Sequence, residues 1–221
     1  LLKESIEALK IRPDGIYVDG TLGGGGHSEA ILKQLTTGHL YAFDQDAMAI
    51  EIAKKRLENY ANLTIIEANF EKLTEALNAR QVFHIDGIIL DLGMSSFQID
   101  EKDRGFSYMQ DAPLDMRMNK KSGYSAYQFI NEASYETLVK VFSEYGEEPF
   151  TRPIAKKIIE SRPLLTTFDL VRITDSFKFK QKAHSAKQVF QAIRIYVNNE
   201  LGVLESVLEQ SIPLLNPNGA I

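Results

Sequence analysis

The stretch IYVDGTLGGGGHSEAIL, residues 16–32, decides the fold. It begins with a short apolar run that is typical of a buried β-strand, and it ends in a helix-like pattern. Four consecutive glycines, residues 23–26, lie between the two. Glycine lets the backbone approach a ligand closely, and a helix N-terminus offers free amide donors. Because four adjacent glycines are costly for folding, we interpret residues 19–27 as a ligand-binding loop.

Three more apolar runs predict strands of the same kind, at residues 40–43, 63–66 and 88–90. Helix-like patterns separate them, so strands and helices alternate along the first part of the chain. The runs are continuously apolar, which is typical of strands with both faces covered by helices. This alternation predicts an α/β fold with a doubly wound, Rossmann-like parallel sheet.

Candidate binding residues stand where the second and third strands end. Asp44 lies 18 residues beyond Gly26, where an acid can accept hydrogen bonds from the ribose of NAD or of S-adenosylmethionine. Its structural alternative is a helix N-cap, for which Asp46 is the better candidate. Phe70 could stack on an adenine ring, although a lone phenylalanine there is more often part of the core.

Asp91 ends the fourth predicted strand. In an open α/β sheet, ligands bind outside the carboxyl ends of the strands, so Asp91 points to the same crevice as the glycine loop. An acid here can bind the amino group of a cosubstrate or a target amine. Capping of the following turn is the competing explanation.

The alternation of strands and helices stops after Asp91. Residues 103–183 show helix patterns punctuated by prolines and no convincing strand. We therefore expect a helical domain at 103–183, inserted between the two parts of the sheet domain at 1–102 and 184–221.

Composition excludes several classes of protein. The chain of 221 residues has no cysteine, which excludes disulfides, thiolate zinc sites and a thiolate nucleophile. No apolar run approaches the ~18 residues that span a bilayer, and no secretory signal is visible. We expect a cytoplasmic protein with no membrane partner and no metal.

The charge is unevenly distributed along the chain. Its net value is −5, but residues 101–187 carry 15 Lys and Arg against 12 Asp and Glu. Residues 177–194 contain five basic residues and no acidic one, with phenylalanines interleaved. Cations bind phosphates and aromatic faces stack on unpaired bases, so an RNA contact is one interpretation. The other interpretation is a basic, solvent-exposed segment that leads into a helix.

Five blocks of sequence resemble the RsmH/MraW family, in family order and over nearly the whole chain. They are DGTLGGGGHS (19–28), DLGMSSFQID (91–100), RGFSYMQDAPLDMRM (104–118), YGEEPFTRPIAKKI (145–158) and FQAIRIYVNNEL (190–201). The resemblance implies a class I S-adenosylmethionine-dependent methyltransferase with an inserted all-helical domain. It also implies the activity of a 16S rRNA (cytosine-N4)-methyltransferase, acting in the decoding (P-site) region of the small ribosomal subunit.

The resemblance also implies roles for individual residues. The expected cosubstrate-binding residues are Gly25, Gly26, His27, Asp44, Phe70, Asp91 and Gln98. Asp44 should hold the ribose, and Phe70 should lie against the adenine. Asp91 and Gln98 should line the methionine end and the entry for the base. In the helical domain, Arg104, Arg117 and the basic run near His184 should help to hold RNA.

The expected reaction is a direct in-line transfer in which the cytosine N4 attacks the methyl carbon of the sulfonium, the bond from sulfur to that carbon breaks, and S-adenosylhomocysteine leaves. Asp91 is the catalytic candidate, because accepting hydrogen bonds from N4 would favour the reactive, pyramidal nitrogen. The final proton acceptor is not assigned. Methylation at cytosine C5 generally requires a cysteine that adds to the ring, so the absence of cysteine supports amino-group chemistry.

Compared with the family pattern, the chain is expected to be truncated at both ends, with a fifth strand beginning only where it stops. Residues 185–211 predict one long amphipathic helix, and residues 213–219 predict the turn before that strand. Two alternative functions stay open, an NAD-binding oxidoreductase and a non-catalytic RNA-binding fragment. Formation of a homodimer is left open too.

Overall fold

The structure is a computed structural model that describes residues 1–221 except 95–100, 121–122 and 178–183. Within these described ranges, no helix is long and apolar enough to cross a membrane.

The chain forms two compact units. The first consists of Leu1–Ser95 and Leu201–Ile221, and the second consists of Ser96–Glu200. The insertion predicted at 103–183 lies inside the second unit, which extends further at both ends. The second unit extends beyond residue 183 because the helix at Lys187–Val197 packs against the other helices of this unit.

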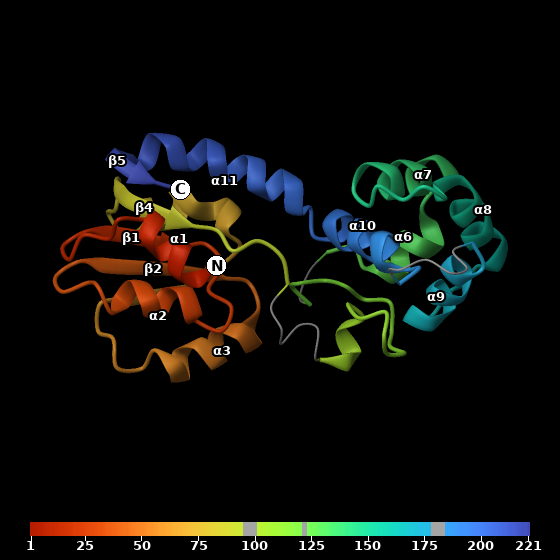
Figure 1. Cartoon of the computed structure of the whole chain (residues 1–221), viewed down its shortest axis with the longest axis horizontal. Helices are drawn as coiled ribbons and strands as arrows, with labels where there is room; N and C mark the ends of the chain where they lie inside the picture. Colours follow the sequence, from red (N-terminus) through yellow and green to blue (C-terminus); the bar gives the residue numbers. More distant parts are fainter. Residues whose placement is uncertain (95–100, 121–122, 178–183) are drawn as a thin grey trace. The chain divides into compact units, whose positions relative to one another are not determined.

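A five-stranded parallel sheet runs through the first unit in the order β3-β2-β1-β4-β5 (Figure 1). Its strands are β1 (Ile16–Asp19), β2 (His39–Asp44), β3 (Leu63–Glu67), β4 (Ile85–Ile89) and β5 (Leu215–Ala220). In the register of the sheet, Val18 of β1 pairs with Tyr41 of β2 and with Ile88 of β4. The predicted α/β class with a doubly wound parallel sheet is confirmed.

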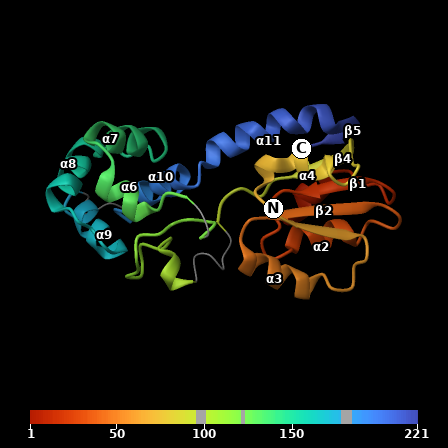
Figure 2. The ribbon, with the colours of Figure 1, turned by 180° about the vertical axis from the view of Figure 1, so that it is seen from behind.

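Helices cover both faces of this sheet, which explains why its strands are continuously apolar (Figure 2). The bounds are α1 (Leu2–Ala8), α2 (Gly26–Leu32), α3 (Ala47–Arg56), the 3-10 helix η1 (Phe70–Lys72), α4 (Leu73–Asn78) and α11 (Glu200–Leu214). Tyr17 points into an apolar cluster with α1, α2 and α3. The neighbouring Val18 points into a second cluster with α4 and α11. Successive strand residues thus serve opposite cores.

The second unit is helical. Its described elements are η2 (Lys102–Arg104), α6 (Ala126–Glu132), α7 (Tyr135–Glu144), α8 (Thr151–Ser161), α9 (Thr167–Asp175) and α10 (Lys187–Val197). Ser125 begins α6 with a capping box, because its Oγ accepts a hydrogen bond from the Gln128 amide and the Gln128 side chain accepts one from the Ser125 amide. Buried Phe129 and Phe142 meet edge to face at 6.3 Å between ring centroids, which joins α6 to α7.

The single long helix predicted at 185–211 is wrong, because the structure has two helices there. The break lies at Asn198 and Asn199, and Asn199 has a positive φ of 48°. The Asn198 side chain donates hydrogen bonds to the carbonyls of Met116 and Arg194, in competition with helical backbone bonds. Leu201, which would lie on the apolar face of a single amphipathic helix over 185–211, is 51% exposed.

The turn predicted at 213–219 is also wrong. These residues include most of β5, which pairs in parallel with β4 from Ile85 opposite Leu215 to Gly87 opposite Ala220. The side-chain amide of Asn216 donates a hydrogen bond to the Asp86 carboxylate at 2.8 Å, and Leu215 packs on the second apolar cluster. The fifth strand therefore lies within the chain and does not begin after it.

Candidate functional site

The strand order places a topological switch point between β1 and β4. From β1 the chain adds β2 and β3 on one side, and then β4 and β5 on the other. Parallel sheets bind ligands in the crevice outside the carboxyl ends of the strands at such a point. The glycine loop follows β1, and Asp91 follows β4 by two residues. The two predicted elements therefore come from the strands that flank this crevice.

The glycine loop adopts a backbone that only glycine accommodates easily. Gly25 has a φ of +77°, and a Cβ atom built on it would lie 3.1 Å from Cδ1 of Leu57 on the side of α3. Its amide donates to the Leu22 carbonyl at 2.8 Å, which closes the turn before α2. Outside the turn, Arg56 Nη1 donates to the Gly24 carbonyl at 3.3 Å. The loop is thus held by its own backbone and by α3.

Asp44 binds the glycine loop directly. Its Oδ2 accepts a hydrogen bond from the Gly23 amide at 2.8 Å, and its Oδ1 accepts one from the Asp46 amide, also at 2.8 Å. Burial raises the pKa of Asp44, while these two amide bonds lower it in part. Asp46 caps α3, as predicted, by accepting a hydrogen bond from the Met48 amide at 3.1 Å. Asp46 is therefore the N-cap of the helix, and Asp44 binds the glycine loop.

Asp19 and Thr21 connect the loop to β4, and we did not single them out from the sequence. Asp19 is fully buried at the end of β1, where its carboxylate accepts hydrogen bonds from Ser28 Oγ at 2.7 Å and from the Thr21 amide at 3.0 Å. The Thr21 hydroxyl in turn accepts a hydrogen bond from the Asp91 amide at 2.7 Å. The signal was present, since Asp19 ends its strand as Asp44 does, and Asp91 follows its own strand by two residues.

Asp91 lies at the solvent-facing end of this network. Its side chain is 67% exposed, and its Oδ2 lies 3.5 Å from Nδ1 of His27, whose own side chain is 19% exposed. His27 is the second residue of α2 and follows the glycines directly. The structure thus brings His27 and Asp91 together from opposite sides of the switch point.

Phe70 lies close to the start of the glycine loop. A Cβ atom built on Gly20 would be 3.5 Å from the Phe70 Cβ atom. Phe70 is half-buried at the start of η1 and packs on the second apolar cluster. Phe70 therefore contacts the core and remains partly exposed to solvent. Gln98 lies outside the described residues.

The model of the MraW methylase family matches residues 1–221. The chain belongs to that family. It is 53% identical over 221 residues to "Ribosomal RNA small subunit methyltransferase H 1" of Acholeplasma laidlawii (strain PG-8A), and 49% identical over 228 residues to "Ribosomal RNA small subunit methyltransferase H" of Clostridium botulinum (strain Loch Maree / Type A3). Each alignment covers 100% of this chain and 74% of the relative.

Solved structures show a weaker likeness. An rRNA methylase from Streptococcus thermophilus is 20% identical with a TM-score of 0.35, over 50% of this chain and 65% of that one. TrmN from Thermus thermophilus is 20% identical with a TM-score of 0.34, over 40% of this chain and 26% of that one. At these TM-scores the likeness decides nothing about the activity.

Membership in the MraW methylase family confirms the resemblance found in the sequence, the class I methyltransferase fold and S-adenosylmethionine as the methyl donor. The crevice suits such a ligand. The glycine loop brings backbone without side chains to the switch point, and Asp44 offers carboxylate oxygens beside it. Asp91 is exposed there, and its carboxylate makes a long contact to His27. These features fit a ligand with a ribose and an amino group.

Two arginines that were expected to hold RNA make hydrogen bonds within the chain itself. Arg104 is 3% exposed, and its Nη2 donates to the carbonyls of Arg117 and Met118 at 2.9 Å each. The expectation that Arg104 contacts RNA is therefore wrong, because its guanidinium is buried. Arg117 makes two side-chain hydrogen bonds to Asp115, at 3.1 and 2.7 Å, and is 25% exposed.

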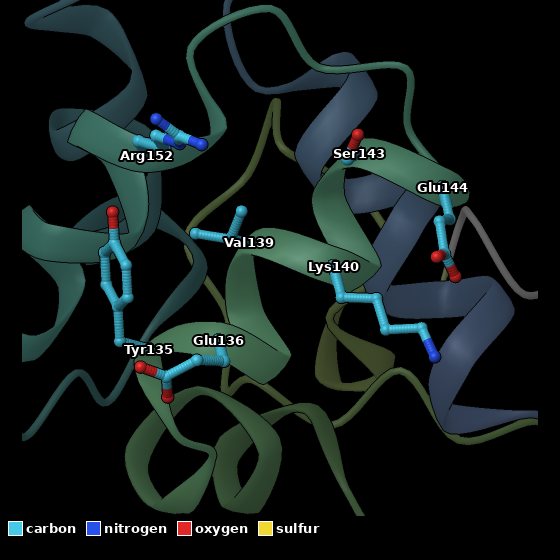
Figure 3. Close-up of a pocket in the computed structure, with 7 residues that line it drawn as sticks. All are labelled: Tyr135, Glu136, Val139, Lys140, Ser143, Glu144 and Arg152. Carbon is cyan, nitrogen blue, oxygen red and sulfur yellow. The ribbon is translucent and has the colours of Figure 1, made fainter.

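A surface hollow in the helical unit has none of the predicted site residues in its lining (Figure 3). It is lined by Tyr135, Glu136, Val139, Lys140, Ser143, Glu144 and Arg152. Its two cations are balanced by two carboxylates, so it does not favour an anion. Among the residues that the structure describes, no group of three or more acidic or histidine side chains could hold a metal ion.

Proposed function

We propose that this chain transfers a methyl group from S-adenosylmethionine to the exocyclic N4 of a cytosine in the decoding (P-site) region of 16S rRNA. The observation that carries the proposal is the position of Asp91, exposed at the switch point and tied by its amide to Thr21 of the glycine loop. The names of its relatives, which are methyltransferases of small-subunit ribosomal RNA, support RNA as the substrate.

The proposed donor site consists of Gly25, Gly26, His27, Asp44, Phe70, Asp91 and Gln98. Asp44 accepts hydrogen bonds from the ribose hydroxyls with the lone pairs that the Gly23 and Asp46 amides leave free. Phe70 lies against the adenine. S-adenosylmethionine, when bound, supplies an activated methyl group, so the protein contributes mainly alignment.

Asp91 orients the target amine. Its exposed carboxylate accepts a hydrogen bond from the N4 amino group, which directs the nitrogen lone pair away from the ring and toward the methyl carbon. His27, at 3.5 Å, limits the positions that this carboxylate can take. No step requires a nucleophilic side chain, which agrees with a chain that has no cysteine. The base must be single-stranded or flipped to reach the site.

The test is transfer of labelled methyl from S-adenosylmethionine to small ribosomal subunits that lack the modification, followed by nucleoside analysis. The expected product is N4-methylcytidine at one position of the decoding region. Label in another nucleoside, or binding of S-adenosylmethionine with no transfer, would contradict the proposal. Preferential binding of NAD would favour the oxidoreductase alternative, and RNA binding without either ligand would favour a non-catalytic fragment.

A further inference from the structure

An aromatic pair stands at the surface of the helical unit. The rings of Tyr108 and His184 are stacked, with centroids 4.4 Å apart and planes 26° apart. The edge of Tyr108 meets the buried Phe190 of α10 at 5.6 Å and 87°, which supports the pair from within. Tyr108 and His184 are half-buried, and the adjacent Met109 is 68% exposed. A supported aromatic surface therefore reaches solvent at this place.

The hydrogen bonds of His184 leave one ring nitrogen as a donor. The Ala186 amide donates to Nδ1 of His184 at 3.2 Å. Nδ1 is therefore the acceptor, and the neutral imidazole carries its proton on Nε2. Within the described part of the chain, Nε2 has no hydrogen-bond partner. The stacked ring thus offers both an aromatic face and an N–H donor.

A buried hydroxyl holds this ring in place. Ser185 is 7% exposed, and its Oγ donates a short hydrogen bond to the Asp175 carboxylate and lies 3.0 Å from Oγ1 of Thr174. Both partners belong to the last turn of α9. The backbone that follows His184 is therefore fixed to α9, so the aromatic pair needs little ordering before it binds a ligand.

The charge around the pair favours an anionic ligand. Lys187, three residues after His184, is exposed and forms no ion pair with a described residue. Asp175, an acid close to His184 in the fold, accepts the hydrogen bond from Ser185 Oγ. Residues 177–194 contain five basic residues and no acidic one. An aromatic face, an N–H donor and an unpaired cation together match an unpaired nucleotide, since each base has a face to stack and each linkage a phosphate.

We propose that Tyr108 and His184 form a contact site for an unpaired nucleotide of the RNA substrate. The base stacks on the aromatic pair, His184 Nε2 donates a hydrogen bond to it, and Lys187 lies against its phosphate. This inference rests on the proposed function, since it assumes RNA as the substrate. It places the contact on half-exposed aromatic residues and not on the buried Arg104.

Affinity of the full chain for a single-stranded oligoribonucleotide of decoding-region sequence tests this site, measured by fluorescence anisotropy at fixed salt. Tyr108→Ala should weaken binding by roughly 5- to 100-fold, the range expected for one stacked base. Tyr108→Phe should bind like the wild type, because it keeps the ring. Tyr135→Ala, at an exposed tyrosine on α7, should change nothing.

An abasic nucleotide at the contacted position distinguishes stacking from a general effect. It should weaken binding to the wild type, and it should weaken binding to Tyr108→Ala no further. If Tyr108→Ala does not fold, His184→Gln replaces it, with the same expected loss. Wild-type affinity in a folded Tyr108→Ala or His184→Gln chain overturns the inference.

The readout separates this inference from the proposed function. If the wild type binds RNA through Tyr108 but transfers no methyl group to cytosine, the proposed function fails and the contact site stands. If the wild type forms N4-methylcytidine and Tyr108→Ala has an unchanged KM for RNA, the contact site fails and the function stands.

Discussion

Nδ1 of His27 lies 3.5 Å from Oδ2 of Asp91, although the two residues are 64 positions apart in the sequence. His27 belongs to the helix after β1, and Asp91 follows β4. The hydrogen bond from the Asp91 backbone amide to the Thr21 hydroxyl, at 2.7 Å, joins the same two segments. The backbone of Asp91 is therefore fixed to the glycine loop, and its exposed carboxylate lies beside His27 at the point where the sheet reverses its order.

Replacement of Asp91 tests the orienting role of this carboxylate. Asp91→Ala should abolish methyl transfer while leaving the unfolding temperature close to that of the wild type, because the side chain is 67% exposed and the backbone bond to Thr21 persists. Transfer is measured with labelled S-adenosylmethionine. Asp14→Ala, at an exposed acid before β1, is the matched control and should keep full activity. Wild-type transfer by Asp91→Ala would remove Asp91 from the mechanism.

Replacement of His27 tests whether the imidazole positions Asp91. His27→Leu should lower kcat by roughly 10- to 100-fold, as small displacements of an aligning group do. His27→Gln should retain more activity, because its amide can still donate to the carboxylate. If His27 only binds the cosubstrate, both variants should raise the KM for S-adenosylmethionine to the same extent and leave kcat unchanged.

Much of this site was visible in the sequence, because its residues stand at strand ends. Continuous apolar runs predicted four strands, and parallel strands in a doubly wound sheet bring their carboxyl ends to one edge. The contacts of Asp44 with Gly23 and of His27 with Asp91 follow from that arrangement. The hydrogen bond from the Asp91 amide to the Thr21 hydroxyl could not be predicted in this way, because it depends on the path of the loop.

The C-terminal part of the chain was harder to predict, for two physical reasons. The apolar spacing of residues 185–211 continues across Asn198, so periodicity alone cannot locate a break that is made by side-chain hydrogen bonds to Met116 and Met118. Strand β5 contains Pro217 and Gly219, which are usual turn residues. Its pairing with β4 depends on a contact with Asp86, 130 residues away in the sequence.

Two adjacent glycines should respond differently to the same substitution. Gly25→Ala should lower the free energy of unfolding by about 1–2 kcal/mol, because φ is +77° and the new Cβ would lie 3.1 Å from Leu57. Gly26→Ala should leave stability unchanged, since its Cβ would meet only Arg56 Nη1 at 3.8 Å. Urea denaturation measures both.

The substitution at Gly26 also tests the proposed donor site. Gly26→Ala should bind S-adenosylmethionine more weakly, because its methyl group would occupy the space that the ligand needs next to the backbone. Isothermal titration calorimetry measures the affinity. If Gly26→Ala is as stable as the wild type and binds the ligand equally well, the backbone at Gly26 does not approach the cosubstrate.

The buried carboxyl of Asp19 makes a prediction about stability and pH. Burial raises the pKa of Asp19, and hydrogen bonds from Ser28 and Thr21 offset this only in part. The folded state therefore binds this proton more tightly than the unfolded chain, whose pKa is about 3.9. As pH rises above that value, the contribution of Asp19 to the free energy of unfolding falls.

Asp19→Asn removes this titration and can keep the hydrogen bond from the Thr21 amide, because its carbonyl oxygen accepts it. Relative to the wild type, the variant should therefore become more stable as the pH rises above about 4. Urea denaturation at several pH values measures the difference, which would stay constant if Asp19 did not titrate in this range.

Asp86→Asn is the control of opposite sign. Despite desolvation, hydrogen bonds from Asn216 and the Ile16 amide and the charge of Arg12 lower the pKa of Asp86. The wild type should thus gain stability over Asp86→Asn as the pH rises.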